Sequence, residues 1–314
     1  MSMYIGIDLG GTNIAGALVD ADGVIQKRFD APTNASGGAF AVLEGIMKVC
    51  QSLVAEDSPP LSIGIGVPGA VKGETGDVIF TPNVPLSGLN IADYLRTGFS
   101  CPIYLANDAN CAALGETLFG GAKDAQNVVF ITLGTGVGSG IVLGGRLHTG
   151  VNDAAGELGH MVIAAGGREC GCGRFGCWES YASATGLVLT ANEFIGTHQE
   201  SALSELSDVE AEKLDGRLIF DAFRSGDSVA ALVVDTYIEH LAVGVVNIIN
   251  ILEPDIICLG GGISNSWDVI AEPLQKAVDA EHFLRNAPGI SQTRIVKATL
   301  GNDAGIIGAA MLGR

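Results

Sequence analysis

The chain has 314 residues, of which 47% are hydrophobic and 17% are charged; this composition is typical of a globular protein and excludes a disordered chain. Its formal net charge of −18 argues against nucleic acids and anionic membrane surfaces as partners, because like charges repel. The seven cysteines are an odd number, and three of them lie close together in the sequence. This pattern favours metal ligation in a reducing compartment over a disulfide framework.

The N-terminus leads from Met1 directly into a strand-like run, without the basic segment that opens a secretory signal. Two apolar stretches, 127–145 and 241–252, contain glycine or asparagine residues. We expect both to be buried core elements rather than membrane spans. The sequence therefore predicts a soluble, cytoplasmic protein.

Apolar runs separated by turn signals predict the elements of the first half: strands at 4–8 and 14–19 around a Gly-rich turn, a helix at 38–54, strands at 61–67 and 103–105, and a helix at 109–119. The second half repeats this order, with strands at 128–133 and 140–143, long helical segments through Asn250, a strand at 255–259 and a helix at 267–280. Alternating strands and helices predict an α/β chain with mostly buried sheets.

Two segments about 120 residues apart resemble each other, and this similarity makes an internal repeat a candidate. Residues 7–12 run into Ile14, and residues 131–136 run into Val137; each reads as an apolar strand, a tight glycine turn and a second apolar strand. One interpretation is two domains of related topology. The alternative is a chance similarity between two Gly-rich hairpins, which are common.

Glycine turns of this kind can bind phosphate, because backbone N–H groups approach the anion closely. The first turn adds a hydroxyl, an amide and a carboxylate, and the second could hold another part of the same anion; the alternative is that each is merely a turn. The candidate residues are Asp8, Gly10, Gly11, Thr12 and Asn13 in the first turn, and Gly134, Thr135, Gly136 and Gly138 in the second.

A formal G-x-G-x-x-G pattern occurs at Gly64, Gly66 and Gly69. We reject it as a dinucleotide site, because no helix is predicted after it and no acidic residue follows at the required spacing. The P-loop pattern is also absent, since Gly-Lys does not occur in the chain.

Four residues have the composition of a closed zinc site: His160, Cys170, Cys172 and Cys177. Three thiolates and one imidazole fill a tetrahedron and leave no position for water, so the site would be structural. A disulfide among the three cysteines is the alternative. The other cysteines, Cys50, Cys101, Cys111 and Cys258, lie in apolar segments and are expected in the core.

Three acidic residues are candidates for chemistry. Asp108 follows Asn107 at a strand-to-helix junction, where either residue could simply cap the helix, or the Asp108 carboxylate could accept a proton from a hydroxyl. Glu157 and Glu179 flank the cysteine–histidine cluster. A metal-ordered loop would hold both rigidly enough to bind vicinal sugar hydroxyls; the alternative is that they are ordinary exposed glutamates.

Taken together, these motifs resemble the ROK family (repressor, open reading frame, kinase) of the sugar-kinase, actin and heat-shock ATPase superfamily. The matching segments span nearly the whole chain: Asp8-Leu9-Gly10-Gly11-Thr12, Asn107-Asp108-Ala109-Asn110, Leu133-Gly134-Thr135-Gly136-Val137-Gly138, Glu157-Leu158-Gly159-His160, Cys170-Gly171-Cys172-Gly173 with Cys177 and Glu179, and Gly260-Gly261-Gly262. The resemblance implies two actin-like ATPase (ribonuclease H-like) α/β domains with an interdomain cleft. The smaller domain would comprise 1–117 and 300–314, and the larger 118–299.

The resemblance also assigns roles to residues. The two glycine turns would hold the ATP phosphates, Gly261 and Gly262 would lie near the nucleotide, and Asp8 would help to hold Mg²⁺. The residues at the family's sugar contacts are Asn83, Asn107, Asp108, Glu157, His160 and Glu179, with Asp108 as the catalytic base. His160 would bind zinc through one ring nitrogen and a sugar hydroxyl through the other.

The implied reaction is phosphorylation of a hexose at its 6-hydroxyl by ATP, and within the family the motifs are most similar to those of bacterial glucokinases. Alternatives are a kinase for N-acetylglucosamine, N-acetylmannosamine, mannose, fructose or allose, and a non-catalytic sugar sensor or transcriptional regulator. Trp178 and the pair Asn152-Asp153 depart from the family pattern, which bears on the choice of hexose. Relatives are commonly homodimers or homotetramers.

Overall fold

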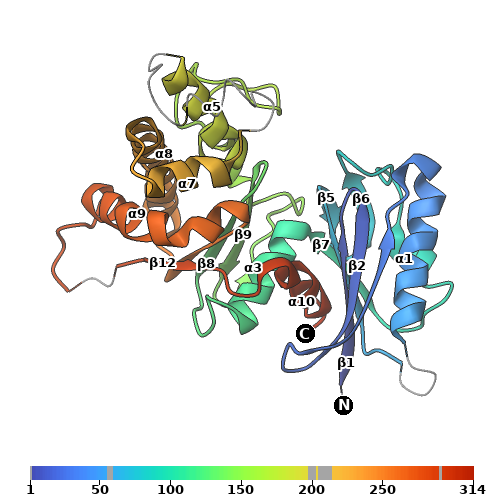
Figure 1. Cartoon of the computed structure of the whole chain (residues 1–314). Coiled ribbons are helices and arrows are strands. Elements are labelled where there is room, and N and C mark those ends of the chain that lie inside the picture. Colours follow the sequence, from blue (N-terminus) through green and yellow to red (C-terminus); the bar gives the residue numbers. More distant parts are fainter. Residues whose placement is uncertain (1, 55–58, 197–202, 204–213, 290–291) are drawn as a thin grey trace. The chain divides into compact units, whose positions relative to one another are not determined.

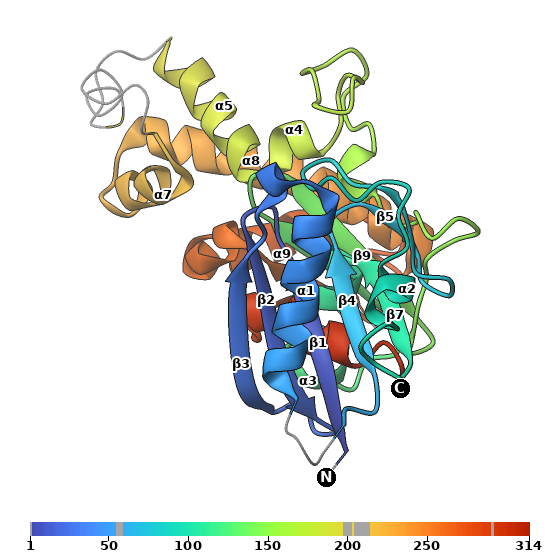
Figure 2. The same cartoon turned by 90° about the vertical axis from the view of Figure 1, so that its right-hand side faces the viewer.

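The structure is a computed structural model, and it describes residues 2–54, 59–196, 203, 214–289 and 292–314 (Figures 1 and 2). The chain divides into two compact units. Unit 1 comprises Met1–Phe130, Gly140–Gly156 and Ala298–Arg314, and unit 2 comprises Ile131–Ser139 and Glu157–Lys297. The domain boundaries expected from the sequence stay a prediction, because compactness does not establish that a segment folds on its own.

The first sheet has five strands in the order β3-β2-β1-β4-β7. These strands are β1 (Met3–Leu9), β2 (Asn13–Asp20), β3 (Ile25–Pro32), β4 (Ile63–Val67) and β7 (Ile103–Asn107). β2 pairs antiparallel with both β1 and β3, whereas β4 pairs parallel with both β1 and β7. All five residues of β4 are buried, as expected for a strand that is covered on both faces.

Helices cover both faces of this sheet (Figure 1). Successive residues of a strand face opposite sides, and each side of β1 and β2 has its own core. On one side Ile7 and Ile14 pack with Ile46 of α1 (Ala39–Leu53). On the other side Ala17 packs with Ile306 of α10 (Ala304–Ala310), and α10 also packs against α3 (Asp108–Phe119).

The smaller elements of unit 1 lie in its connections. They are η1 (Ala35–Gly37), β5 (Ala70–Lys72), β6 (Asp77–Phe80), α2 (Ile91–Leu95), β10 (Arg146–Leu147) and η4 (Gly301–Asp303). β5 and β6 form a two-stranded antiparallel hairpin of their own.

The second sheet has the order β10-β9-β8-β11-β12. Its further strands are β8 (Val128–Leu133), β9 (Val137–Leu143), β11 (Ile256–Gly260) and β12 (Arg294–Lys297). Numbered along the chain, both sheets therefore have the strand order 3-2-1-4-5. The prediction that the two glycine hairpins belong to a repeated topology is confirmed, because a chance similarity of two hairpins does not place five strands in the same order.

The helices of unit 2 pack around α8, which contacts α5, α7 and α9 (Figure 1). In chain order the elements are η2 (Leu158–His160), α4 (Glu179–Ala182), α5 (Ala184–Ile195), α7 (Gly216–Arg224), α8 (Ser228–Leu252), η3 (Gly262–Ser266) and α9 (Trp267–Glu281). By length and composition α8 could cross a membrane, but 61% of its most apolar 18-residue window is buried inside the protein. The helix is mostly buried, as expected for a core element at 241–252.

Most predicted elements are present, and their ends differ by a few residues. The helix predicted at 38–54 is α1, which begins one residue later and ends one residue earlier. Edge strand β3 was not predicted, because its exposed polar residues hide the apolar alternation on which the prediction depends. Where the helical prediction covers 197–202 and 204–213, it lies outside the described residues.

Glu116, near the end of α3, has no exposed surface. Its carboxylate accepts three hydrogen bonds from backbone N–H groups: from Gly121 at 2.7 Å, from Thr299 at 3.0 Å and from Leu300 at 2.8 Å. This one side chain therefore ties the end of α3 to the segment that leads into α10.

We expect Glu116→Gln to lower the free energy of unfolding by about 2–4 kcal/mol, because the amide nitrogen of glutamine would face N–H donors and leave buried groups unpaired. Urea unfolding measures the change. The matched control is Glu44→Gln on the exposed side of α1, which should stay within about 0.5 kcal/mol of the wild type. A Glu116→Gln variant as stable as this control would contradict the interpretation.

Candidate functional site

The first glycine turn joins β1 to β2 and leaves Gly11 and Thr12 exposed. The N–H of Gly10 donates to the carbonyl of Asn13 at 2.9 Å, and the hydroxyl of Thr33 donates to the carbonyl of Gly10 at 2.7 Å. The turn is thus fixed while its outer backbone stays accessible. Asn83 lies beside it, because a Cβ built on Gly11 would be 3.6 Å from the Cβ of Asn83.

Asp8 and Asp108 come together through the packing of α3 against the sheet. Asp8 pairs in register with Gly66 of β4, and a Cβ on Gly66 would lie 3.5 Å from the Cα of Asp108 and 3.3 Å from the Sγ of Cys111. Glycine at this position lets the first turn of α3 approach the strand. Two carboxylates from distant parts of the sequence are therefore neighbours in a largely buried setting.

This setting raises the pKa of both groups. Burial, and to a smaller extent the charge of Asp108, raise the pKa of Asp8 to about 6. Burial also raises the pKa of Asp108, although the N–H of Ala109, which donates to its Oδ1 at 2.8 Å, partly offsets this effect. A carboxyl group with a raised pKa is a stronger base than an exposed one, which suits it to accept a proton.

Asn107 is the N-cap of α3, which is one of the alternatives that the sequence left open. Its Oδ1 accepts hydrogen bonds from the N–H groups of Ala109 at 2.9 Å and Asn110 at 3.2 Å, and its Nδ2 donates to the carbonyl of Gly69 at 3.1 Å. The cap fixes where the helix begins. It thereby sets the position of Asp108 as the first helical residue.

The second glycine turn joins β8 to β9 and is held by the start of α5. The N–H of Gly134 donates to the carbonyl of Gly136 at 3.0 Å, and the N–H of Ala184 donates to the carbonyl of Gly134 at 2.8 Å. The hydroxyl of Thr185 donates to the carbonyl of Thr135 at 2.8 Å. As in the first turn, the backbone is fixed by neighbouring residues.

Gly261 follows β11 and has a left-handed φ of 81°, which favours glycine. A Cβ at this residue would lie 2.5 Å from the carbonyl oxygen of Leu133, the last residue of β8. The structure therefore brings the predicted nucleotide residues Gly261 and Gly262 close to the second turn.

Glu179 links the second turn to the cysteine–histidine cluster. Its Oε2 accepts a hydrogen bond from the N–H of Val137 at 2.9 Å, and its Oε1 lies 3.7 Å from the Sγ of Cys170. A Cβ on Gly136 would be only 2.3 Å from Oε2, so glycine is required there for this contact. The sequence indicated that Glu179 flanks the cluster but not that it also binds the turn.

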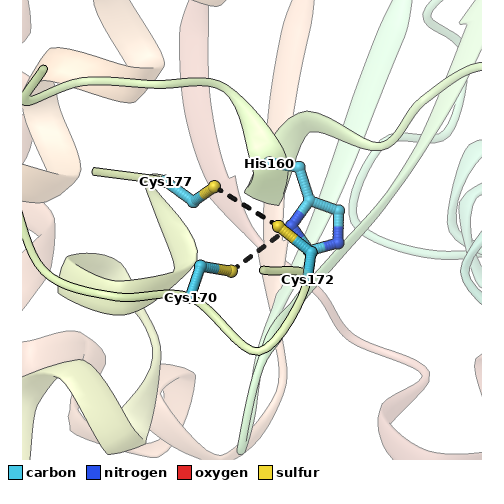
Figure 3. A group of neighbouring side chains, drawn as sticks. All are labelled: His160, Cys170, Cys172 and Cys177. Carbon is cyan, nitrogen blue, oxygen red and sulfur yellow. Dashed lines mark hydrogen bonds between the residues drawn. The ribbon is translucent and has the colours of Figure 1, made fainter. Parts of the chain in front are cut away.

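His160, Cys170, Cys172 and Cys177 converge, with their ligand atoms within 4.8 Å of one another (Figure 3). The Sγ of Cys170 lies 3.7 Å from Nδ1 of His160, and the Sγ atoms of Cys172 and Cys177 are also 3.7 Å apart. A tetrahedral zinc site with bonds of about 2.3 Å places sulfur atoms about 3.8 Å apart. All seven cysteines are free, so the disulfide alternative is wrong.

The thiols of the cluster differ in environment. Burial and the neighbouring thiols raise the pKa of Cys177 to about 12, whereas the backbone N–H of Arg174 is the main cause of the lowered pKa of Cys172. A buried thiol of high pKa becomes a good ligand when a cation replaces its proton. The four residues could therefore hold one metal ion of zinc type.

Two side chains whose structural role the sequence analysis did not identify anchor the cluster loop. The guanidinium of Arg168 lies 4.7 Å from the centre of the Tyr181 ring and forms a 2.7 Å ion pair with Glu193. Trp178 is fully buried and donates from Nε1 to the carbonyl of His240 at 3.0 Å. A large aromatic residue next to a cluster cysteine is the one signal in the sequence that could have identified this anchor.

Glu157 directly precedes η2, and His160 is its last residue. η2 lies beside β9, because the N–H of Leu158 donates to the Oγ of Ser139 at 3.2 Å. Glu157 is exposed. Each unit thus carries part of the predicted set. Unit 1 holds Asp8, the first turn, Asn83, Asn107 and Asp108, and unit 2 holds the second turn, Gly138, Glu157, His160, Glu179, Gly261, Gly262 and the cysteines.

The rejected dinucleotide pattern has a packing role. Gly64 and Gly66 lie in β4, and the residue after Gly69 begins strand β5 rather than a helix. The expectation that no helix follows Gly69 is confirmed. Among the other cysteines, Cys50, Cys111 and Cys258 are buried as expected, and Cys101 is half-buried.

Comparisons with known proteins place these features in one family. The sequence model of the ROK family matches residues 4–314. A glucokinase from Halalkalibacterium halodurans is 38% identical over 314 residues, which cover 98% of this chain and 94% of that protein. An N-acetyl-D-glucosamine kinase from Vibrio atlanticus is 33% identical, with 99% of each chain covered. The crystal structure of a ROK family glucokinase from Streptomyces griseus in complex with glucose and AMPPNP is similar with a TM-score of 0.79, 31% identity and 99% of each chain covered.

The raised pKa of Asp8 predicts that Asp8→Asn stabilises the protein at neutral pH. The carboxyl group titrates near 3.8 in a model compound and at about 6 in the folded state, so the folded state holds the proton more tightly and stability falls as the pH rises through this window. Urea unfolding should show a gain of about 1–3 kcal/mol for Asp8→Asn at pH 7.5, which disappears near pH 4.

The control for this prediction is Asp20→Asn. Hydrogen bonds, first from the N–H of Val24, lower the pKa of Asp20, so its contribution is present at neutral pH and is lost as the pH falls. This variant should lose stability at pH 7.5. An Asp8→Asn variant that also loses stability at pH 7.5 would show that Asp8 is not destabilised by its surroundings.

Proposed function

Because the chain belongs to the ROK family, we propose that it is a sugar kinase that transfers the γ-phosphoryl group of ATP to the 6-hydroxyl of a hexose, with glucose as the preferred substrate. The observation that carries the proposal is the partly buried pair of Asp8 and Asp108 next to the first glycine turn. Full-length similarity to a protein named glucokinase, and to a solved relative that holds glucose and AMPPNP, supports it.

Asp108 is the proposed general base. Its carboxylate would take the proton of the 6-hydroxyl as that oxygen attacks the γ-phosphorus, and ADP would leave from the opposite side. Phosphoryl transfer requires alignment and charge neutralisation more than covalent participation by the protein. A capped helix start that fixes the carboxylate, and burial that raises its pKa, support this role.

The nucleotide would bind to the two glycine turns. The proposed contacts are Gly10, Gly11, Thr12, Asn13, Gly134, Thr135, Gly136, Gly138, Gly261 and Gly262. Their support is that each turn is fixed by hydrogen bonds from its neighbours, as a preorganised anion site requires. Asp8 would help to hold Mg²⁺, which when bound neutralises charge on the transferred phosphoryl group.

The hexose would contact Asn83, Asn107, Asp108, Glu157, His160 and Glu179. In His160, Nδ1 faces Cys170, which leaves Nε2 for a sugar hydroxyl and supports the division of the two ring nitrogens. Glu179, whose Oε2 already binds a backbone N–H, is held rigidly enough to discriminate hydroxyl positions.

The metal of the cysteine–histidine cluster is proposed to be a structural Zn²⁺ ion. His160, Cys170, Cys172 and Cys177 would complete its coordination and leave no position for substrate. When bound, the ion would order the loop that carries His160 and Glu179, and it would take no part in the chemistry. Sulfur–sulfur and sulfur–nitrogen separations of 3.7 Å support this assignment.

One other substrate is favoured by an observation. Similarity to an N-acetyl-D-glucosamine kinase over 99% of each chain makes that amino sugar the second candidate. A sensor or regulator without catalysis is disfavoured, because both Asp8 and Asp108 are present. Work in the cytoplasm, and assembly as a homodimer or homotetramer, are proposed from the family resemblance alone.

The function is tested by an ADP-coupled assay of the wild type and Asp108→Asn. Across glucose, mannose, fructose, allose, N-acetylglucosamine and N-acetylmannosamine, the wild type should have its highest kcat/KM with glucose. Asp108→Asn should lower kcat by about 10²–10⁴-fold, the contribution of a positioned base. Titration calorimetry should show that this variant still binds glucose.

The control is Asp93→Asn, an exposed residue in the first turn of α2, which should retain the kcat of the wild type. A wild type that phosphorylates none of these sugars would refute the kinase. An Asp108→Asn variant with undiminished kcat would refute the base.

The zinc proposal predicts about one equivalent of zinc per chain in protein purified without chelator, measured by inductively coupled plasma mass spectrometry. Cys172→Ser should reduce this content severalfold and lower the Tm, because a structural ion contributes folding free energy. Cys101→Ser, which removes a thiol outside the cluster, is the matched control. Zinc content equal in the two variants would count against the site.

A further inference from the structure

Asp153 adopts a left-handed backbone conformation, which is uncommon for residues other than glycine and is most often accepted by Asn and Asp. Its φ is 54°, in the left-handed region where a Cβ is strained and glycine is not. It lies in the loop 149–156 and belongs to the pair Asn152-Asp153, one of the departures from the family pattern. The hydrogen bonds of its carboxylate show what the side chain does in this conformation.

The carboxylate of Asp153 joins two segments that are distant in sequence. Its Oδ1 accepts a hydrogen bond from the hydroxyl of Thr149 at 2.6 Å, and its Oδ2 accepts one from the N–H of Gly73 at 3.3 Å. Gly73 belongs to the turn between β5 and β6. The first bond shapes the loop, and the second clips it to the hairpin.

A cavity of about 560 Å³ lies between these segments. It is lined by Ala70, Lys72, Asp77 and Ile79 of the hairpin, and by Asn152 and Ala154 of the loop. The loop residues that line it are the two neighbours of Asp153. The clip therefore sets the separation of two walls of the cavity.

Both walls continue into residues that we assign to hexose binding. Ala70 follows Gly69, whose carbonyl accepts a hydrogen bond from the side-chain amide of Asn107. At the other wall, the loop ends at Gly156, and Glu157 is the next residue of the chain. A displacement of either wall would be passed directly to a sugar-contacting side chain.

We infer that Asp153 is a positioning residue for hexose binding, which acts by clipping the loop 149–156 to the β5–β6 turn. It touches neither substrate nor reacting atoms in this role. The inference rests on the proposed function and deepens it, because it names a residue of this chain that governs the affinity for sugar and not the affinity for ATP.

The test compares Asp153→Gly, Asp153→Asn and Thr149→Val in steady-state kinetics with glucose and ATP varied separately. Asp153→Gly relaxes the backbone but removes both hydrogen bonds, and it should raise the KM for glucose about tenfold. Its kcat and its KM for ATP should stay within about twofold of the wild type. Thr149→Val, which removes one bond, should have a smaller effect, and Asp153→Asn, which keeps one acceptor, should restore most of the affinity.

The matched control is Asp124→Gly, because Asp124 is an exposed residue of the same unit with a φ of 71°. It receives the same relief of backbone strain, and its KM for glucose should not change. A second readout needs no substrate: hydrogen exchange of the Gly73 amide, followed by NMR, should accelerate at least about tenfold in Asp153→Gly and not in the control.

The outcomes separate the two proposals. A wild type without sugar kinase activity overturns the proposed function and the positioning role with it. An active wild type whose KM for glucose is unchanged in Asp153→Gly overturns the positioning role alone. A lower kcat together with a higher KM for both substrates overturns it as well, because it indicates general loosening of the structure. An unaltered exchange rate of the Gly73 amide also overturns it, because it indicates that Asp153 does not hold this group.

Discussion

The close packing of α3 against β4 is the constraint on which the rest of unit 1 depends. Gly66 has no side chain, so the first turn of the helix reaches the strand and Asp108 becomes a neighbour of Asp8. Bringing two carboxylates together away from water is unfavourable, and the raised pKa of Asp8 is the measure of that cost. The surrounding core of β1, β4, α1 and α10 must supply the free energy that offsets it.

In unit 2 the side chain of Glu179 is the contact on which the arrangement of the predicted site residues depends. One oxygen is fixed by a backbone N–H of the second glycine turn, and the other faces the cluster of thiols. A change in the position of the Cys170 loop would therefore be transmitted to the second glycine turn through the side chain of Glu179.

Local strain and local repulsion recur at these sites. Asp8 is held against a like charge, and Asp153 is held in a left-handed conformation. Elsewhere the same fold uses acidic groups to gain stability, as Glu116 does with three backbone N–H groups. The unfavourable features of Asp8 and Asp153 lie beside residues that we assign to substrate binding. Such a placement is typical of a site that trades stability for function.

The sequence by itself determined the local features: the glycine turns, the strands around them, the junction of strand and helix at Asn107-Asp108, and the residue types of the cysteine–histidine cluster. Each of these depends on backbone preferences or side-chain chemistry within a few residues, which a sequence displays directly. The order of the motifs along nearly the whole chain indicated the family.

Only the tertiary structure decided which of these features meet. The pairing of Asp8 with Asp108, the double role of Glu179, the anchors Arg168 and Trp178, and the bond from Gly73 to Asp153 all join segments far apart in the chain. Such contacts follow from the register of strands and the packing of helices on them. No local pattern encodes them, because the free energy that sets them comes from the burial of the whole core.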